Sequence, residues 1–298
     1  MAARADAAAG LVLALGGSEL AARDLAAELG WACEPVACHR FPDGESRVAI
    51  PPALPERVVL FASLHDPDGK LVTLMLAAET ARELGARELI LVAPYLCYMR
   101  QDMAFEPGQA VSQRIVGRFL GRMFDAVITV DPHLHRIDRL AQAVPSARAV
   151  SLSAAPEIGR FVLAQGLRPL MLGPDGESLP WVRAAAAQGG LEFAVCRKTR
   201  LGDRSVEIAL PDVALEGRAV VLVDDVASTG HTLARCAALV LEAGAASVDV
   251  AVTHALFAGD ALDLLHAAGV RGVWSTDAIP HETNRIRLAP LLAQAVLG

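Results

Sequence analysis

The residues best suited to chemistry lie in the stretch AVVLVDDVASTGHTL, residues 219–233. Five apolar residues run into two aspartates, Asp224 and Asp225, and a turn rich in small and hydroxyl residues follows. In open parallel sheets, ligands bind beyond the carboxyl ends of the strands. Amides and hydroxyls at a helix start suit a phosphate, whereas carboxylates accept hydrogen bonds from sugar hydroxyls. The stretch therefore predicts a pentose phosphate site, with the phosphate candidates Ser228, Thr229, Gly230, His231 and Thr232.

A plainer interpretation of this stretch is an ordinary strand-to-helix turn with a solvated Asp pair and a Thr cap. For an Asp-Asp pair alone, the ordinary turn would be favoured. The full string is more specific, because acid, glycine and hydroxyl residues all occur where a strand gives way to a helix.

The elements that must position these residues alternate along the whole chain. Short β-branched runs, which predict strands, occupy 11–17, 57–63, 88–94, 126–130, 169–173, 192–196, 219–223, 247–254 and 272–276. Alanine-rich amphipathic segments, which predict helices, include 18–30, 69–85, 111–123 and 230–243. Such alternation is typical of an α/β protein with mainly parallel sheets. Since the pattern occurs twice, we expect two similar domains, 1–150 and 151–298.

The composition of the chain excludes several classes of function. The 298 residues contain 27 Lys and Arg against 34 Asp and Glu, a net charge of −7. This balance argues against general binding to nucleic acid or to a membrane surface. No stretch approaches the roughly 20 apolar residues of a membrane span. The five scattered cysteines and the absence of a signal-like start predict a cytoplasmic protein with reduced thiols.

The 219–233 stretch resembles the phosphoribosyl-diphosphate signature of type I phosphoribosyltransferases and of ribose-phosphate diphosphokinases. Five other segments resemble the diphosphokinases in order along residues 11–298: RFPDGESRVAI (40–50), APYLCYMRQD (93–102), FEPGQAVSQRIVGRFL (105–120), TVDPHLHR (129–136) and CRKTRLGDRSVEI (196–208). The last is similar to the archaeal-type branch of the family. A simple phosphoribosyltransferase would have one such domain and no Arg-Gln-Asp segment. The resemblance therefore implies two type I phosphoribosyltransferase-like domains.

The resemblance also assigns roles to individual residues. It makes Arg100, Gln101, Asp102 and His133 contacts of ATP, and Phe41, Asp43 and Glu45 contacts of the adenine bound by a neighbouring subunit. It makes His133 and Asp175 ligands of Mg²⁺, with Asp131 and His135 as orienting residues. Lys198 and Arg200 would stabilise the transition state from a mobile loop.

The implied reaction moves the diphosphoryl group of ATP to the anomeric hydroxyl of ribose 5-phosphate. The implied enzyme requires Mg²⁺, holds ATP between its two halves and is a homo-oligomer, dimeric or larger. Its ribose 5-phosphate site would use Asp224, Asp225 and residues 228–232.

The chain departs from the family pattern in its diphosphate loop. The family has Pro-Asp-x-Gly-Gly, whereas Gly176, Glu177 and Ser178 follow Asp175 here. Glu177 favours an alternative, a degenerate regulatory homologue, while the intact Lys198 and Arg200 count against it. Two further alternatives are a phosphoribosyltransferase and, least favoured, a nucleotide-binding interaction protein. Formation of AMP separates all of these.

Overall fold

The computed structural model describes residues 10–201 and 205–298, with the side chains of 198–201 and 205–207 outside the description. The strands are β1 Leu11–Ala14, β2 Ala32–Pro35, β3 Ala37–Arg40, β4 Ser46–Ala49, β5 Arg57–Phe61, β6 Glu88–Ala93, β7 Ala126–Val130, β8 Arg148–Leu152, β9 Leu170–Gly173, β10 Phe193–Val195, β11 Arg197–Leu201, β12 Ser205–Ala209, β13 Ala219–Ala227, β14 Ser247–Ala255, β15 Val270–Thr276 and β16 Asn284–Ile286. The helices are α1 Glu19–Leu29, α2 Pro67–Glu83, α3 Ser112–Met123, α4 Ala155–Ala164, α5 Leu179–Ala187, α6 His231–Glu242, α7 Ala261–Ala267 and α8 Ala289–Leu297, with 3₁₀ turns at Leu140–Gln142 and Gly176–Ser178.

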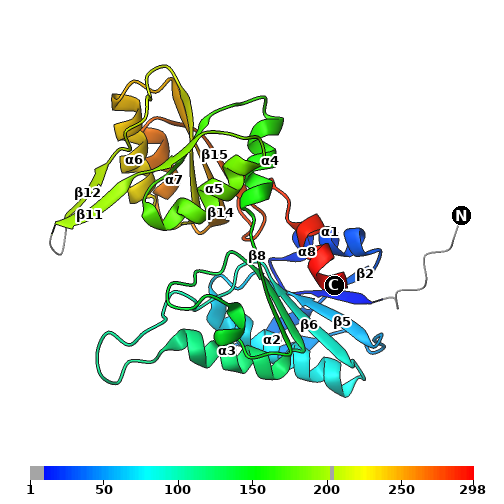
Figure 1. Ribbon diagram of the computed structural model, residues 1–298. Coiled ribbons are helices and arrows are strands. Elements are labelled where there is room, and N and C mark those ends of the chain that lie inside the picture. The colour runs from blue at the N-terminus through cyan, green and yellow to red at the C-terminus, as the bar shows by residue number, and fades with distance from the viewer. Residues whose placement is uncertain (1–9, 202–204) are drawn as a thin grey trace, which may run out of the picture. The chain divides into compact units, whose positions relative to one another are not determined.

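The chain forms two compact units, each built on a parallel sheet (Figure 1). The strand orders are β2-β1-β5-β6-β7-β8 in unit 1 and β10-β9-β13-β14-β15-β16 in unit 2. When the strands of each unit are counted from the first strand of that unit, the two orders are the same. The predicted α/β class and the predicted repetition of the pattern are therefore confirmed.

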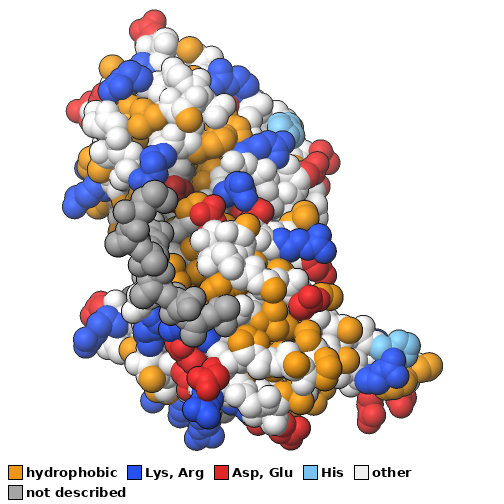
Figure 2. All heavy atoms as spheres, turned by 90° about the vertical axis from the view of Figure 1, so that its right-hand side faces the viewer, with side chains coloured by type: hydrophobic (Ala, Val, Ile, Leu, Met, Phe, Trp, Pro, Cys, Tyr) orange, Lys and Arg blue, Asp and Glu red, His pale blue; other side chains and the backbone are white. Residues whose placement is uncertain are grey.

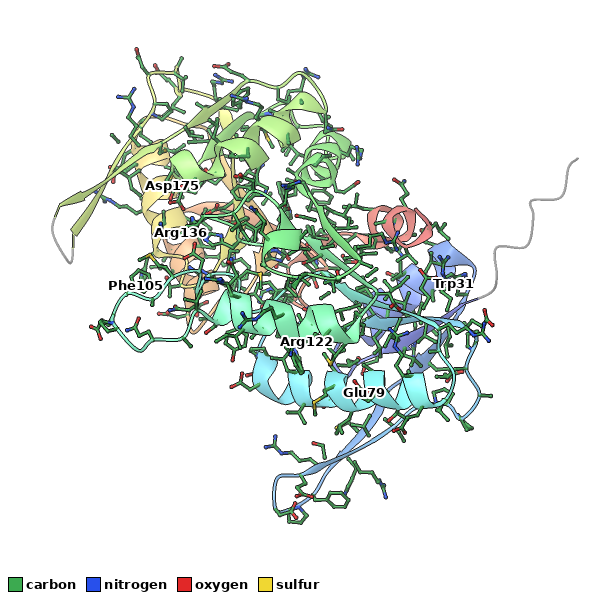
Figure 3. All side chains as sticks on the ribbon, turned by 60° about the horizontal axis from the view of Figure 1, so that its bottom comes forward. Trp31, Glu79, Phe105, Arg122, Arg136 and Asp175 are labelled. Atoms are coloured by element: carbon green, nitrogen blue, oxygen red, sulfur yellow. The ribbon has the colours of Figure 1, made fainter. Side chains whose placement is uncertain are left out.

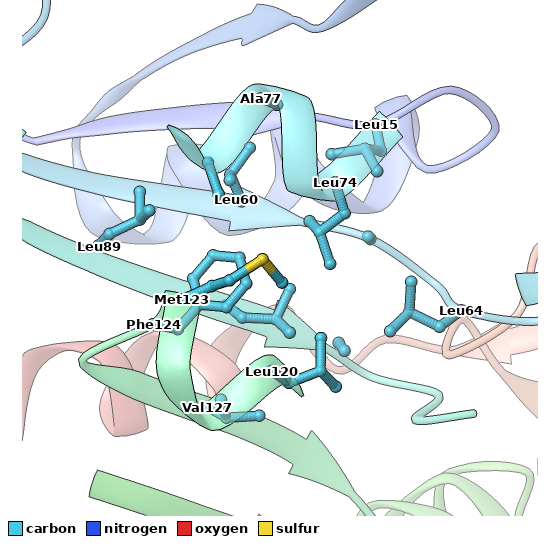
Figure 4. Packing of buried hydrophobic residues seen from close by; sticks show 14 of the residues in the cluster. Leu15, Leu60, Leu64, Leu74, Ala77, Leu89, Leu120, Met123, Phe124 and Val127 are labelled. Atoms are coloured by element: carbon cyan, nitrogen blue, oxygen red, sulfur yellow. The ribbon is translucent and has the colours of Figure 1, made fainter. Parts of the chain in front are cut away.

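The central strands are apolar along their length because helices cover both faces of each sheet. In unit 1, side chains of β5, β6 and β7 pack against α2 and α3, and Figure 4 shows this contact around Leu60, Leu74 and Leu120. In unit 2, the cluster that includes Leu172, Leu222 and Leu233 fills the corresponding space beneath α6 and α7. These cores hold the strand ends in fixed positions relative to each other within each unit.

Each unit also carries a two-stranded antiparallel hairpin between its second and third sheet strands. Strands β3 and β4 form it in unit 1, and β11 and β12 form it in unit 2. The resemblance implies a loop in the second of these segments. This expectation was wrong for the backbone, because Arg197–Leu201 pairs along its length with Ser205–Ala209.

The last helix, α8, belongs to unit 1. The units comprise Met1–Leu152 with Leu288–Gly298, and Ser153–Arg287. The sequence analysis had assigned the whole of 151–298 to one domain. Helix α8 packs against α1 and buries Leu292 and Val296, and Figure 1 shows the two helices side by side. In unit 2, α4 packs against α5 in the matching place.

One local expectation was wrong. Strand β13 was expected to end at Val223, but it continues to Ala227 and includes both aspartates, because Asp224 stays in register with Val252 of β14. Ser18 directly precedes α1, but its hydroxyl makes no capping bond. The Ser18 hydroxyl instead accepts a hydrogen bond of 3.0 Å from the Ser63 amide after β5.

We expect Leu292→Ala to destabilise unit 1 because it opens a cavity where α8 packs on the unit. Leu292 is 2% exposed, so the cost should be about 2–5 kcal/mol. Leu297→Ala on the same helix is the matched control, since Leu297 is 52% exposed. Urea unfolding followed by hydrogen exchange of β1 and α1 measures the difference. Equal effects of the two substitutions would contradict the assignment of α8 to unit 1.

Candidate active site

The acidic residues of unit 2 gather at one edge of its sheet. Strands β9 and β13 are parallel neighbours, with Leu172 opposite Leu222. Asp175 follows the end of β9, and Asp224 lies in the last part of β13. The carboxyl ends of parallel strands meet at the same edge, so these carboxylates face a common region.

The surroundings of Asp224 shift the pKa of its carboxyl group. Burial, reinforced by the negative charges of Asp225 and Asp175, raises the pKa of Asp224 well above its usual range. The Asp225 amide donates a 3.0 Å hydrogen bond to Asp224 Oδ1, which partly offsets the effect. Asp225 itself is 5% exposed. Asp175, Asp224 and Asp225 are thus close enough for the charges of the other two to act on Asp224.

The loop after β9 is shaped by Asp175. The Asp175 carboxylate accepts a 3.0 Å hydrogen bond from the Glu177 amide and caps the short 3₁₀ turn. The Ser178 hydroxyl donates a 2.6 Å bond to the Asp175 carbonyl. A side chain at Gly173 would lie 2.2 Å from the Ser178 oxygen, so that position requires glycine. The Glu177 side chain is exposed and makes no described bond within the cluster.

Backbone hydrogen bonds from the residues that follow β14 hold the start of the predicted phosphate loop in place. The amides of Leu256 and Phe257 each donate a 3.0 Å hydrogen bond to the Ala227 carbonyl, and the Ala258 amide donates one to Ser228. Gly230 has a φ of 75°, and a Cβ there would lie 3.1 Å from the Ala261 carbonyl. The loop ends at the start of α6, whose first amides lack partners within the helix. Thr229 and His231 are exposed beside these amides, as a phosphate site needs.

Lys198 and Arg200 lie on β11, and their side chains are outside the described part of the chain. Their backbone pairs with Ile208 and Val206 of β12. The hairpin begins at Cys196, whose amide donates a 2.8 Å bond to the Gly173 carbonyl. The base of the hairpin is therefore fixed to the strand that leads to Asp175, and Figure 1 shows the hairpin extending from unit 2.

The predicted nucleotide residues of unit 1 come together around two strand ends. The Pro94 carbonyl after β6 accepts a 3.2 Å bond from the Val130 amide of β7, which joins the two ends. Asp102 forms an ion pair with Arg136 at 3.5 Å, so the 100–102 and 131–136 segments are in contact. Figure 3 labels Arg136 and Phe105 in this region. Arg100 is exposed, as a cation that binds phosphate must be.

A buried glutamine fixes the Arg-Gln-Asp segment. The side-chain amide of Gln113, at the start of α3, donates a 2.9 Å bond to the Met99 carbonyl. The Gln113 backbone amide donates a 3.1 Å bond to the Gln101 carbonyl. Neither Gln113 nor Arg136 was singled out from the sequence. For Gln113, the only signal in the sequence was its place at the start of a predicted helix. For Arg136 there was no signal, because its partner Asp102 lies far away along the chain.

The segment after β7 has a strained backbone. Asp131 is 6% exposed and has a φ of 39°, which is unusual for a residue with a side chain. The rings of His133 and His135 meet edge to face, with centroids 4.0 Å apart, and their Nε2 atoms are in contact. The two rings are therefore in direct contact on the segment that also carries Arg136.

Phe41, Asp43 and Glu45 form the tip of the β3–β4 hairpin. The Phe41 amide bonds the Glu45 carbonyl at 2.8 Å, and Asp43 accepts from the Glu45 amide at 3.1 Å. Figure 2 shows the hairpin as a projection that carries basic, acidic, histidine and apolar side chains. In Figure 3 it leaves unit 1 on a different side from the Phe105 loop. The structure therefore does not bring this tip together with the Arg100–Asp102 segment of the same chain.

The carboxylates of unit 2 suit magnesium better than the histidines of unit 1 do. Within residues 10–201 and 205–298, no group of three or more His, Cys, Asp and Glu side chains is arranged to enclose a metal ion. Magnesium is usually held by one or two carboxylates, with water and substrate phosphates as its other ligands. The neighbouring carboxylates of Asp175, Asp224 and Asp225 are the oxygen ligands that such a partial site needs.

Comparisons with known proteins cover both units. A family model described as the N-terminal domain of ribose phosphate pyrophosphokinase matches residues 11–123, and a phosphoribosyl transferase domain model matches residues 154–270. A ribose-phosphate pyrophosphokinase of Methanopyrus kandleri is 39% identical over 290 residues, which cover 96% of this chain and 98% of the relative. The chain belongs to the ribose-phosphate pyrophosphokinase family.

Other members support the same conclusion. The ribose-phosphate pyrophosphokinase of Halobacterium salinarum is 36% identical over 96% of this chain and 100% of its own length. The crystal structure of phosphoribosylpyrophosphate synthetase from Mycobacterium smegmatis has the same fold, with a TM-score of 0.80 at 23% identity over 96% of this chain and 97% of that one. The family predicted from the segments at 40–50, 93–102 and 129–136 is therefore confirmed.

No helix in the described parts of this pyrophosphokinase chain is both long enough and apolar enough to cross a bilayer.

We expect Asp224→Asn to stabilise the ligand-free protein at neutral pH. Folding raises the pKa of Asp224 above its unfolded value of 3.8, so the ionised carboxylate lowers the free energy of unfolding. As the pH falls through the raised pKa, native Asp224 becomes protonated and its destabilising effect disappears. The gain in stability from Asp224→Asn should therefore shrink in acid. Urea midpoints measured with chelator between about pH 5 and 8 test this. Asp212→Asn, at an exposed loop position, is the control. A pH-independent gain would contradict the expectation.

Proposed function

We propose that this chain transfers the diphosphoryl group of ATP to the anomeric hydroxyl of ribose 5-phosphate. The products would be 5-phosphoribosyl 1-diphosphate and AMP. The observation that carries the proposal is the edge of unit 2, where Asp224 and Asp225 precede the 228–232 loop at the start of α6. Membership of the pyrophosphokinase family supports the same reaction.

Ribose 5-phosphate would bind along this edge. Its 5′-phosphate would accept hydrogen bonds from the first amides of α6 and from the hydroxyls of Ser228, Thr229 and Thr232. Asp224 and Asp225 would accept hydrogen bonds from the ribose hydroxyls. His231, exposed at the first position of α6, would add a donor to the phosphate.

ATP would be bound by the residues around the β6 and β7 ends. Arg100 presents a forked cation for phosphate oxygens. The Asp102–Arg136 pair and the Gln113 bonds keep the segment in place without using Arg100 itself. His133, oriented by His135, would contact the nucleotide from the other segment. Phe41, Asp43 and Glu45 would contact the adenine bound by a second copy.

Mg²⁺ would be held at the acidic edge by Asp175, with phosphate and sugar oxygens as further ligands. The ion, when bound, neutralises charge on the transferring group. The raised pKa of Asp224 supports this placement, because a nearby divalent cation would favour the ionised carboxylate. The sequence analysis also named His133 as a ligand. Imidazole is a poor ligand for magnesium, and we propose that His133 acts mainly on the nucleotide.

Catalysis in such a transfer depends on positioning and charge. The anomeric oxygen forms a bond to the β-phosphorus of ATP as the bond to the α-phosphate oxygen breaks. Lys198 and Arg200 would stabilise the charge that spreads over the transferred group. The fixed base of the β11–β12 hairpin at Gly173 and Cys196 directs these residues from the strand beside Asp175. We assign no general base.

A single assay tests the proposal. Purified protein with ATP, ribose 5-phosphate and Mg²⁺ should form AMP, and omission of the sugar or addition of chelator should abolish it. AMP formation no faster than without the sugar would exclude the reaction. It would leave a degenerate homologue, which the exposed Glu177 favours, or a phosphoribosyltransferase, which consumes phosphoribosyl diphosphate without ATP.

The proposal includes two further properties. A shared site implies a homo-oligomer, and a fully active monomer in sedimentation at assay concentration would rule out sharing. We also place the enzyme in the cytoplasm, because all five of its cysteines are free thiols. Cell fractionation tests the location.

We expect Lys198→Ala to lower kcat by roughly 10²–10³-fold with little change in the KM for ribose 5-phosphate, by analogy with loss of one donor to a charged transition state. A cation that meets the diphosphoryl group during transfer acts on the transition state rather than on sugar binding. The double substitution Asp224→Ala with Asp225→Ala should mainly raise the sugar KM. Steady-state kinetics separates the two. A near-normal kcat with a raised KM in Lys198→Ala would make Lys198 a binding residue.

A further inference from the structure

Two buried thiols meet in unit 2 beside the acidic edge. The Cys196 and Cys236 sulfur atoms lie 3.4 Å apart. Cys196 is 1% exposed and Cys236 is fully buried. Neither thiol has a part in the reaction proposed above. Two sulfur atoms in contact, from segments forty positions apart, form a pair that a two-electron oxidant can join.

The two cysteines lie on the two elements that the proposed reaction depends on most. Cys196 separates β10 from β11 and is therefore the first residue of the arm that carries Lys198 and Arg200. Cys236 lies on α6, four positions after Thr232 of the phosphate loop. A covalent bond between them would connect the base of the hairpin to the helix behind the sugar site.

We propose that Cys196 and Cys236 form a reversible disulfide with a hydroperoxide as oxidant. The Cys196 thiolate attacks one peroxide oxygen, the O–O bond breaks, and a sulfenic acid and an alcohol, or water, are formed. The Cys236 sulfur then attacks the Cys196 sulfur and displaces hydroxide, which leaves as water with the Cys236 proton. Overall, two thiols and one hydroperoxide give one disulfide, one alcohol and one water.

The chemical environment makes Cys196 the attacking thiol. Contact with the Cys236 thiol lowers the pKa of Cys196, despite its burial, whereas the same contact raises the pKa of Cys236. Cys196 follows β10, which is the edge strand of its sheet. Local opening of an edge strand requires less free energy than global unfolding, so a small peroxide reaches this sulfur without loss of the fold.

The bond would change the geometry of the arm. A disulfide holds its sulfur atoms about 2.05 Å apart, so the contact of 3.4 Å must close by more than an ångström. This movement pulls on the Cys196 amide, which is bonded to the Gly173 carbonyl. Provided that the proposed function holds, Lys198 and Arg200 would be displaced from the transferring group. A displacement of about 1 Å in such a reaction lowers the rate by roughly 10²-fold.

The test uses the whole protein and two independent readouts. Reduced protein is treated with one equivalent of hydrogen peroxide, remaining thiols are alkylated, and peptides are analysed by mass spectrometry. We expect a peptide pair joined through Cys196 and Cys236 that a dithiol reductant separates. AMP formation measured on the same samples should fall by roughly 10²-fold and recover on reduction.

Matched variants identify the pair responsible. Cys236→Ala should form no cross-link and should keep its kcat through oxidation and reduction cycles. Cys38→Ser removes an exposed thiol and should respond like the native protein. Absence of the cross-link in native protein, or a cross-link with unchanged kcat, would overturn the proposal. Failure of the proposed function alone would appear as no AMP from the reduced protein, while the cross-link is still measured.

Discussion

The parallel pairing of β13 with its neighbours is the interaction on which the candidate site depends. Strand β13 bonds β9 on one side and β14 on the other, so three strand ends reach the same edge. One end supplies Asp175, the second supplies Asp224 and Asp225, and the third supplies the amides that hold the phosphate loop. An antiparallel neighbour would direct its end to the opposite edge and separate these groups. The proximity of the carboxylates costs mutual repulsion, which a cation or a sugar relieves.

The two units have the same strand order but use the matching edge differently. In unit 1, the loop after β5 corresponds to the phosphate loop of unit 2. There the Lys70 ammonium donates hydrogen bonds to the Ser63 carbonyl at 2.9 Å and to the His65 carbonyl at 2.6 Å. Burial lowers the pKa of Lys70, as expected for a cation enclosed by its own loop. In unit 1, a lysine side chain thus bonds the backbone of the loop that corresponds to the proposed phosphate loop of unit 2.

The sequence predicted what local pattern controls. Alternating apolar runs predicted the sheets, and the string at 219–233 predicted a strand that leads into a helix. The phosphate site in this string stays a prediction. The sequence did not predict that β13 runs through both aspartates, because strand length there is decided by pairing with β14 rather than by residue type. Contacts between distant segments, such as Asp102 with Arg136, leave no local pattern. The β11–β12 hairpin was missed because polar and charged residues are weak strand formers, and their mutual pairing overrides that preference.

Because α8 is the last helix of the chain and belongs to unit 1, unit 1 cannot complete its fold until synthesis on the ribosome ends. The chain between the two parts of unit 1, Ser153–Arg287, must be synthesised before α8 exists. At usual rates of translation this takes on the order of ten seconds. During that time α1 lacks the helix that packs against it. Unit 1, although its first part is made first, can therefore complete its packing only after the whole of unit 2 has been synthesised.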